Sequence, residues 1–206
     1  MRLILCDLPS PRRLNFWPLA LSRPIWELRC GMSRLADKLI ARTGAAEVAC
    51  FVPEYMAGAY REQSEWPVND ASQLQGADLL LVDARVRADG FEVEPAGPGE
   101  VGVDADGNVL YARIPEAELS GVDTSSPRAL LASAAKTLPK GRGHLPVWGY
   151  TWDLVLENPA RIEKDFRARG RSGIEGLVEQ PNAIRGSEKD VYVAPGGVYT
   201  VVARGF

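Results

Sequence analysis

Three arginines in a short segment near the start of the chain have the chemistry to bind an anionic group. Arg12, Arg13 and Arg23 follow the apolar run at residues 3–6, which is too short for a helix and typical of a buried strand. Arginine suits phosphate because its planar guanidinium donates two parallel hydrogen bonds and keeps its charge. Open α/β sheets bind ligands beyond the carboxyl ends of their strands, where this segment would lie. The residues predict an anion site, against the alternative that Arg12 and Arg13 are solvated and Arg23 pairs with a carboxylate.

Two aspartates are candidates to hold Mg²⁺, because carboxylate oxygens are the ligands that this ion prefers in proteins. Asp83 ends the apolar run at residues 77–82, the clearest buried strand in the chain, so its carboxylate is expected at the ligand-binding edge of the sheet. Asp153 stands at the start of an expected helix at residues 152–168. Each has a structural alternative: Asp83 caps the turn after its strand, and Asp153 stabilises a helix N-terminus.

The elements that must position these side chains alternate between strand and helix in the first half of the chain. Such an alternation implies right-handed crossovers and a mostly parallel sheet. The first helix has Ser33 as its expected N-cap and Gly44 as its stop. In order, the strand and helix segments are residues 3–6, 33–42, 47–52, 53–61 and 77–82.

The second half of the chain adds a hairpin and two helices. Residues 101–111 predict a β-hairpin with Asp106 and Gly107 at its turn. Residues 127–138 predict an alanine-rich helix, and residues 152–168 predict a further helix that is interrupted near Pro159. These segments complete the pattern of an α/β protein.

A family resemblance is carried by the segment from Arg13 to Pro24, which has the pattern R-x-x-x-x-P-L-x-x-x-R-P. This pattern resembles the start of the sugar nucleotidyltransferases. With the later Leu28-Arg29-Cys30-Gly31, the chain is most similar to a bacterial group of N-acetylglucosamine-1-phosphate uridyltransferase-like proteins. The resemblance implies a three-layer, nucleotide-diphospho-sugar transferase-like (Rossmann-like) fold with a mixed sheet.

The same resemblance implies an activity and a set of site residues. Its enzymes transfer a nucleotidyl group from a nucleoside triphosphate to a sugar 1-phosphate and release pyrophosphate. It implies that Arg13 and Asp83 are catalytic, and that Asp83 and Asp153 hold Mg²⁺. The residues implied to bind the nucleotide and its phosphates are Asp7, Ser10, Arg12, Arg13 and Arg23.

Two departures from the family pattern leave a second function open. The family has a glycine-rich loop before the arginine, whereas this chain has Pro9 and Pro11, which offer no N–H to a phosphate. The family lysine after Arg-Pro is replaced by Ile25. The alternative is therefore a degenerate, non-catalytic domain that binds a nucleotide or sugar, or that serves as a packing domain of a larger β-helix acyltransferase.

The C-terminal segment predicts the start of a left-handed β-helix. Residues 191–199 resemble one coil, with Val193 and Tyr199 six positions apart. We expect a nucleotidyltransferase-like domain at residues 1–170, a linker at 171–190 and a truncated β-helix at 191–206. A final edge strand is the alternative. An exposed apolar coil would promote self-association, so we expect that the chain forms a homo-oligomer through this β-helix.

Composition narrows the classes of function. The 206 residues are 46% hydrophobic and 25% charged, which is ordinary for a globular protein. The net charge of −3 offers no basic field for nucleic acid. No stretch approaches the roughly 18 apolar residues of a membrane helix, no secretory leader is recognisable, and the three cysteines have neither metal nor disulfide spacing. We expect a cytoplasmic protein that binds neither nucleic acid nor a membrane.

Overall fold

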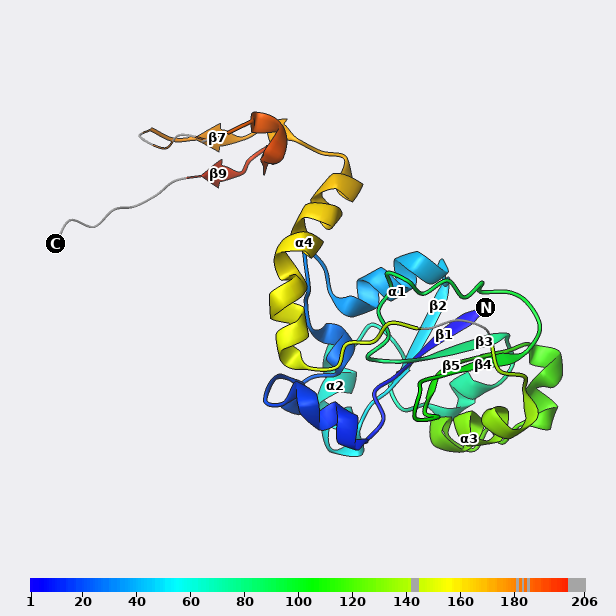
Figure 1. Cartoon of the computed structure of the whole chain (residues 1–206). Coiled ribbons are helices and arrows are strands. Elements are labelled where there is room, and N and C mark those ends of the chain that lie inside the picture. Colours follow the sequence, from blue (N-terminus) through cyan, green and yellow to red (C-terminus); the bar gives the residue numbers. More distant parts are fainter. Residues whose placement is uncertain (142–144, 181, 183, 185, 200–206) are drawn as a thin grey trace.

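A five-stranded mixed sheet organises the body of the protein (Figure 1). The computed structural model describes residues 1–206 except 142–144, 181, 183, 185 and 200–206. The strand order is β2-β1-β3-β5-β4, with β2, β1 and β3 parallel and with β5 antiparallel to both β3 and β4. The predicted mixed α/β sheet is thereby confirmed. The strands are β1 (Arg2–Cys6), β2 (Glu47–Phe51), β3 (Leu79–Asp83), β4 (Glu100–Val103) and β5 (Val109–Ile114).

Helices cover both faces of this sheet and give three layers. Because successive side chains of a strand point to opposite faces, Leu3 and Leu5 join a core with helices α1 and α2 and the first turns of α4. Ile4 and Cys6 join a second core with α3. Because both faces of the sheet are buried, the sequences of its central strands are almost continuously apolar. The helices are α1 (Leu35–Thr43), α2 (Glu54–Gln63), α3 (Pro127–Thr137) and α4 (Thr151–Arg169).

One helix boundary and one expected helix interruption differ from the predictions. The N-cap of α1 is Arg34 rather than Ser33, because Asp37 accepts the backbone N–H of Arg34 at 2.9 Å and also pairs with its guanidinium. Gly44 ends the helix with a φ of 62°, as predicted. Helix α4 runs through Pro159 without a break.

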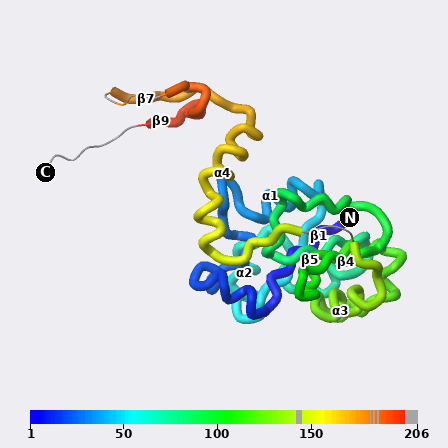
Figure 2. The backbone as a smooth tube through the Cα atoms, in the orientation of Figure 1, coloured from blue at the N-terminus to red at the C-terminus, as the bar shows by residue number. Residues whose placement is uncertain are grey.

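A C-terminal arm, residues 171–199, stands at the far end of α4 and away from the sheet (Figure 2). The segment expected as a linker contains strands β6 (Gly173–Ile174) and β7 (Leu177–Val178). They pair in parallel with β8 (Tyr192–Val193) and β9 (Val198–Tyr199). A solenoid needs about three coils to bury a core, so these two-residue pairs do not establish a β-helix. Residues 200–206 of the expected β-helix lie outside the described residues.

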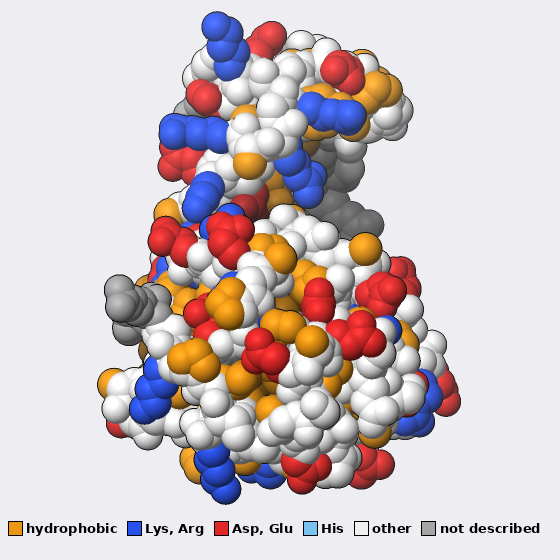
Figure 3. Space-filling view, turned by 90° about the vertical axis from the view of Figure 1, so that its right-hand side faces the viewer, with side chains coloured by type: hydrophobic (Ala, Val, Ile, Leu, Met, Phe, Trp, Pro, Cys, Tyr) orange, Lys and Arg blue, Asp and Glu red, His pale blue; other side chains and the backbone are white. Residues whose placement is uncertain are grey.

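Charge is unevenly distributed over the surface. On the face shown in Figure 3, acidic side chains gather over the middle of the body, whereas Lys and Arg side chains lie toward its margins and on the arm. Among the described residues, no helix is long and apolar enough to cross a membrane.

Candidate active site

The carboxyl ends of β1 and β3 bring Asp7 and Asp83 to one edge of the sheet. Cys6 and Asp83 are paired in register, and the N–H of Ala84 donates to the carbonyl of Cys6 at 2.8 Å. Because β5 is antiparallel to β3, the turn between β4 and β5 lies at this edge too. We call it the carboxyl edge.

The loop after β1 is tied to the β4–β5 turn through Arg12. Its guanidinium pairs with Asp106 and lies 3.6 Å from a carboxylate oxygen of Asp104. The Arg12 side chain is one-third exposed, and Arg23 is exposed as well. These two predicted phosphate ligands are therefore accessible from solvent.

Arg13 is used inside the protein. Its Nε donates to Asp7 at 2.9 Å, its Nη2 to the carbonyl of Ala20 at 2.6 Å, and its Nη1 to the hydroxyl of Tyr55 at 3.1 Å. Asp7 also accepts the backbone N–H of Ile25 at 3.1 Å. Burial raises the pKa of Asp7 to about 6, against the lowering effect of Arg13. The pair therefore anchors the loop, and Arg13 would have to exchange one of these acceptors to reach a phosphate.

Ser10 begins the short 3₁₀ helix Pro11–Phe16 that carries Arg12 and Arg13. Its Oγ accepts the N–H of Arg13 at 3.2 Å. The neighbouring Pro9 and Pro11 have no N–H to offer, and the carbonyl of Pro9 accepts a hydrogen bond from Arg128 at 2.9 Å. The loop presents the Ser10 hydroxyl and the Arg12 guanidinium rather than a row of backbone donors.

Asp83 is paired with Arg85, a residue that sequence reasoning missed. Nε and Nη2 of Arg85 donate to the two carboxylate oxygens at 2.9 and 3.1 Å, and the backbone N–H of Arg85 donates at 2.9 Å. Asp83 thus caps the turn that follows its strand, as the structural alternative expected. The D-x-R spacing directly after a buried strand was the available signal.

Asp153 lies at the N-terminus of α4 and is linked to the same edge. One of its oxygens accepts the backbone N–H groups of Gly149 and Tyr150 at 2.8 and 2.9 Å. The preceding Trp148 donates its N–H to the carbonyl of Arg85 at 2.8 Å. Asp153 thus serves as a helix-capping residue, and the segment just before it is hydrogen bonded to the backbone of Arg85.

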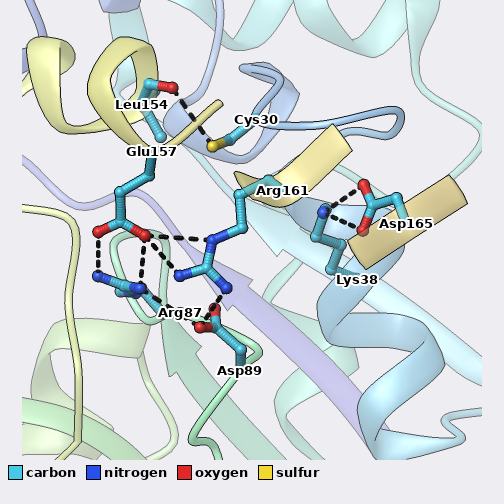
Figure 4. Close-up of polar contacts among 8 residues, drawn as sticks. All are labelled: Cys30, Lys38, Arg87, Asp89, Leu154, Glu157, Arg161 and Asp165. Atoms are coloured by element: carbon cyan, nitrogen blue, oxygen red, sulfur yellow. Dashed lines mark hydrogen bonds and ion pairs between the residues drawn. The ribbon is translucent and has the colours of Figure 1, made fainter. Parts of the chain in front are cut away.

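A network of ion pairs fixes the first turns of α4 against the body (Figure 4). Arg87, which follows the turn after β3, donates to both oxygens of Glu157 at 2.6 and 2.7 Å. Arg161 bridges Glu157 and Asp89. Asp89 has a lowered pKa, because the hydrogen bonds from Arg161 and Arg87 outweigh the effect of burial. The network holds α4, and with it Asp153, in place.

Two further contacts add to this network of ion pairs. The guanidinium of Arg87 lies 4.5 Å from the ring centre of Trp148, a distance at which a cation is attracted to the ring face. Lys38 of α1 donates to Asp165 of α4 at 2.6 Å (Figure 4). Helix α4 is therefore joined to α1 as well as to the segment after β3.

Protein donors engage the two predicted magnesium ligands in this structure. Both oxygens of Asp83 accept hydrogen bonds from Arg85, and one oxygen of Asp153 is taken by two backbone N–H groups. Mg²⁺ requires oxygen ligands that are open to it in a near-ideal octahedron. Over the residues that the structure describes, no group of three or more His, Cys, Asp or Glu side chains could hold a metal ion.

A cavity of about 610 Å³ lies away from this edge, between the β3–β4 connection and strands β4 and β5. Glu100 accepts hydrogen bonds there from the hydroxyl of Tyr111 at 2.8 Å and pairs with Arg113 at 3.1 Å. Arg113 also donates to the carbonyls of Glu94 and Pro98. Glu100 is thus paired with both Tyr111 and Arg113, and none of the predicted site residues lines the cavity.

The fold defines a three-layer α/β protein with a mixed central sheet. The model of the sugar nucleotidyl transferase family matches residues 3–172. The chain therefore belongs to the sugar nucleotidyl transferase family.

Similar solved structures are remote. A Bacillus anthracis protein assigned as a glucose-1-phosphate thymidylyltransferase, in complex with a sucrose, is 8% identical over 79% of this chain and 95% of its own, with a TM-score of 0.47. The molybdopterin-guanine dinucleotide biosynthesis protein A of Archaeoglobus fulgidus is 8% identical over 78% of this chain and 98% of its own, with a TM-score of 0.44. A comparison with curated proteins returned no match. Likenesses this distant say nothing of a substrate.

Proposed function

We propose that the protein transfers a nucleotidyl group from a nucleoside triphosphate to a sugar 1-phosphate. A phosphate oxygen of the sugar 1-phosphate attacks the α-phosphorus, the bond between that phosphorus and the bridging oxygen to the β-phosphate breaks, and pyrophosphate leaves. The observation that carries the proposal is the family match over residues 3–172. The position of Asp7 and Asp83 at one sheet edge, each paired with an arginine, supports it.

The proposed roles follow the accessibility of each side chain. Arg12 and Arg23 are exposed enough to bind phosphate oxygens, with Ser10 beside them at the start of the loop. Asp7 and Arg13 hold that loop in place, and Arg13 acts on the nucleotide only by exchanging one of its internal acceptors. Asp83 remains the proposed catalytic carboxylate of the edge.

The proposal also covers the substrates, the β-helix and the location of the protein. UTP and N-acetylglucosamine 1-phosphate are the first substrate pair to test, because the segment from Arg13 to Gly31 resembles the uridyltransferase-like group. The parallel pairs of the arm are the geometry that successive coils of a β-helix would have. A cytoplasmic location fits an enzyme that uses nucleoside triphosphates.

A second candidate is a non-catalytic domain that binds a nucleotide or sugar, or that packs against a β-helix acyltransferase. Specific contacts favour it. Arg13 is internally hydrogen bonded, Asp153 is a helix cap, and Pro9 and Pro11 flank the loop serine. Each of these features serves the fold and none of them needs turnover.

A pyrophosphate-release assay separates the two candidates. The purified chain is incubated with each of the four common nucleoside triphosphates and a panel of sugar 1-phosphates, with MgCl₂ or with EDTA. The enzyme hypothesis expects pyrophosphate with one triphosphate and only when a sugar 1-phosphate is present. Binding of a triphosphate or nucleotide sugar, detected as a raised melting temperature but without pyrophosphate, would support the non-catalytic domain.

The role of Asp83 is tested with a matched pair of variants. Asp83→Asn is expected to abolish turnover while the melting curve stays cooperative. Asp190→Asn, on the arm and exposed, removes the same charge far from the carboxyl edge and is expected to keep full activity. Retained turnover in Asp83→Asn would rule out a catalytic role for this carboxylate.

A further inference from the structure

We propose that Arg85 is a phosphate ligand of this protein, and that its guanidinium provides at Asp83 the positive charge that a divalent cation was expected to provide. The inference rests on the proposed function, because it names a residue of the same site. The ligand class is a nucleotide with at least two phosphates, or pyrophosphate itself.

The orientation of the Arg85 guanidinium is fixed by Asp83. Its Nε and Nη2 contact the two oxygens of the one carboxylate, which is the two-pronged geometry that sets the plane of the group. The backbone N–H of Arg85 donates to the same carboxylate. The side chain is only 7% exposed, so it pays little conformational entropy when a ligand arrives.

One nitrogen of this guanidinium remains for a ligand. Among the described residues, no acceptor contacts Nη1 of Arg85, whereas Nε and Nη2 are both taken by Asp83. In the described part of the chain, the buried side-chain atom without a hydrogen-bond partner is Nε of Arg87, not Nη1 of Arg85. Within the described part of the chain, Nη1 is therefore the nitrogen of Arg85 that a ligand would meet.

The backbone on either side keeps Arg85 at that edge. Ala84 donates its N–H to the carbonyl of Cys6, and the carbonyl of Arg85 accepts from Trp148, both at 2.8 Å. Val86 forms an isolated β-bridge with Val147. Arg85 is thus held between the end of β1 and the segment that leads into α4.

The charges of the site favour an anion over a cation. Asp7 is paired with Arg13 and Asp83 with Arg85, so both carboxylates at the strand ends are already compensated. A divalent ion at Asp83 would compete with Arg85 for the carboxylate oxygens, and displacement of Arg85 would leave a nearly buried guanidinium without its partner, which is costly. A phosphate that meets Nη1 leaves the Asp83–Arg85 pair intact, and the partly exposed Arg12 lies on the same sheet edge.

The test measures binding of UTP, ATP, GTP, CTP and inorganic pyrophosphate by calorimetry, in MgCl₂ and in EDTA. For the triphosphate that the protein prefers, we expect binding in EDTA. Arg85→Gln should raise the Kd at least tenfold, and Arg85→Lys should raise it less. The Kd of the corresponding nucleoside, which has no phosphate, should not change. Arg171→Gln on the arm is the matched control and should bind like the unaltered protein.

A double variant that removes both charges separates an effect on folding from an effect on binding. Arg85→Gln alone leaves Asp83 without its partner, so the double variant with Asp83→Asn and Arg85→Gln is measured alongside it, with melting curves for both. A folded double variant that binds the triphosphate as tightly as the unaltered protein would overturn the role of Arg85. Binding that requires MgCl₂ and is lost in Asp83→Asn would overturn it in favour of a metal at Asp83. If no triphosphate binds the unaltered protein in either buffer, the proposed function itself fails.

Discussion

The carboxylate of Asp7 lies 2.9 Å from Nε of Arg13, and both side chains are almost completely excluded from solvent. They are six residues apart, one at the end of β1 and the other in the 3₁₀ helix that follows. The pair therefore closes the loop onto the sheet, and Ala20 and Tyr55 add further acceptors to Arg13. The geometry of the candidate site depends on this internal ion pair before any ligand binds.

Removal of Arg13 should destabilise the protein strongly. Arg13→Ala leaves the Asp7 carboxylate buried without its partner, and the loss of one member of a buried pair costs roughly 3–5 kcal/mol. Urea unfolding at pH 7 measures this loss in the free energy of unfolding. Arg12→Ala is the matched control, because Arg12 is partly exposed and pairs with surface carboxylates, so its cost should be about 0–1 kcal/mol. Equal stabilities of the two variants would contradict the anchoring role.

Asp7 should give the stability a pH dependence of unusual sign. Its pKa is raised from the ordinary 3.8 to about 6 by burial. Between these two values the folded protein binds more protons at Asp7 than the unfolded chain, so this group's contribution to the free energy of unfolding decreases as pH rises. Relative to Asp7→Asn, the unaltered protein should lose about 2.4 kcal/mol between pH 4 and pH 7. A difference that stays constant or grows with pH would refute the raised pKa.

Glu157 should contribute far more stability than the nearby Glu163. Glu157→Gln weakens the contacts to Arg87 and Arg161 at a partly buried position, and we expect a loss of about 1–3 kcal/mol. Glu163→Gln breaks an exposed pair with Arg167 on the same helix and should change stability by about 0.5 kcal/mol or less. Thermal unfolding at two salt concentrations checks both values, and a loss in Glu163→Gln equal to that in Glu157→Gln would argue against the network of Figure 4.

Gly31 should not tolerate a side chain. Its φ is +81°, and a Cβ would lie 2.3 Å from a carboxylate oxygen of Asp165. Gly31→Ala should therefore lower the free energy of unfolding by about 1–3 kcal/mol. Gly58→Ala in α2 meets open space and should raise it by about 0.5–1 kcal/mol, because alanine favours a helix. Chemical denaturation should therefore show changes of opposite sign in the free energy of unfolding of the two variants.

The sequence determined the elements of this fold because strand and helix patterns depend on near neighbours. The apolar runs at residues 3–6 and 77–82 became β1 and β3, and Gly44 ended α1. The arginines of the loop and the position of Asp83 at a strand end were also readable from order and spacing. These local features, together with the segment from Arg13 to Pro24, sufficed to indicate the family.

Only the tertiary structure decided which side chain pairs with which. Arg13 and Asp7 are both visible in the sequence, but their burial depends on how the loop from Ser10 to Ile25 folds back onto the sheet. The pairing of strands β6 and β7 with β8 and β9 likewise joins segments about twenty residues apart. Such choices are made by packing and desolvation over the whole chain, because an ion pair or a strand pair gains its energy only where folding removes the competing water.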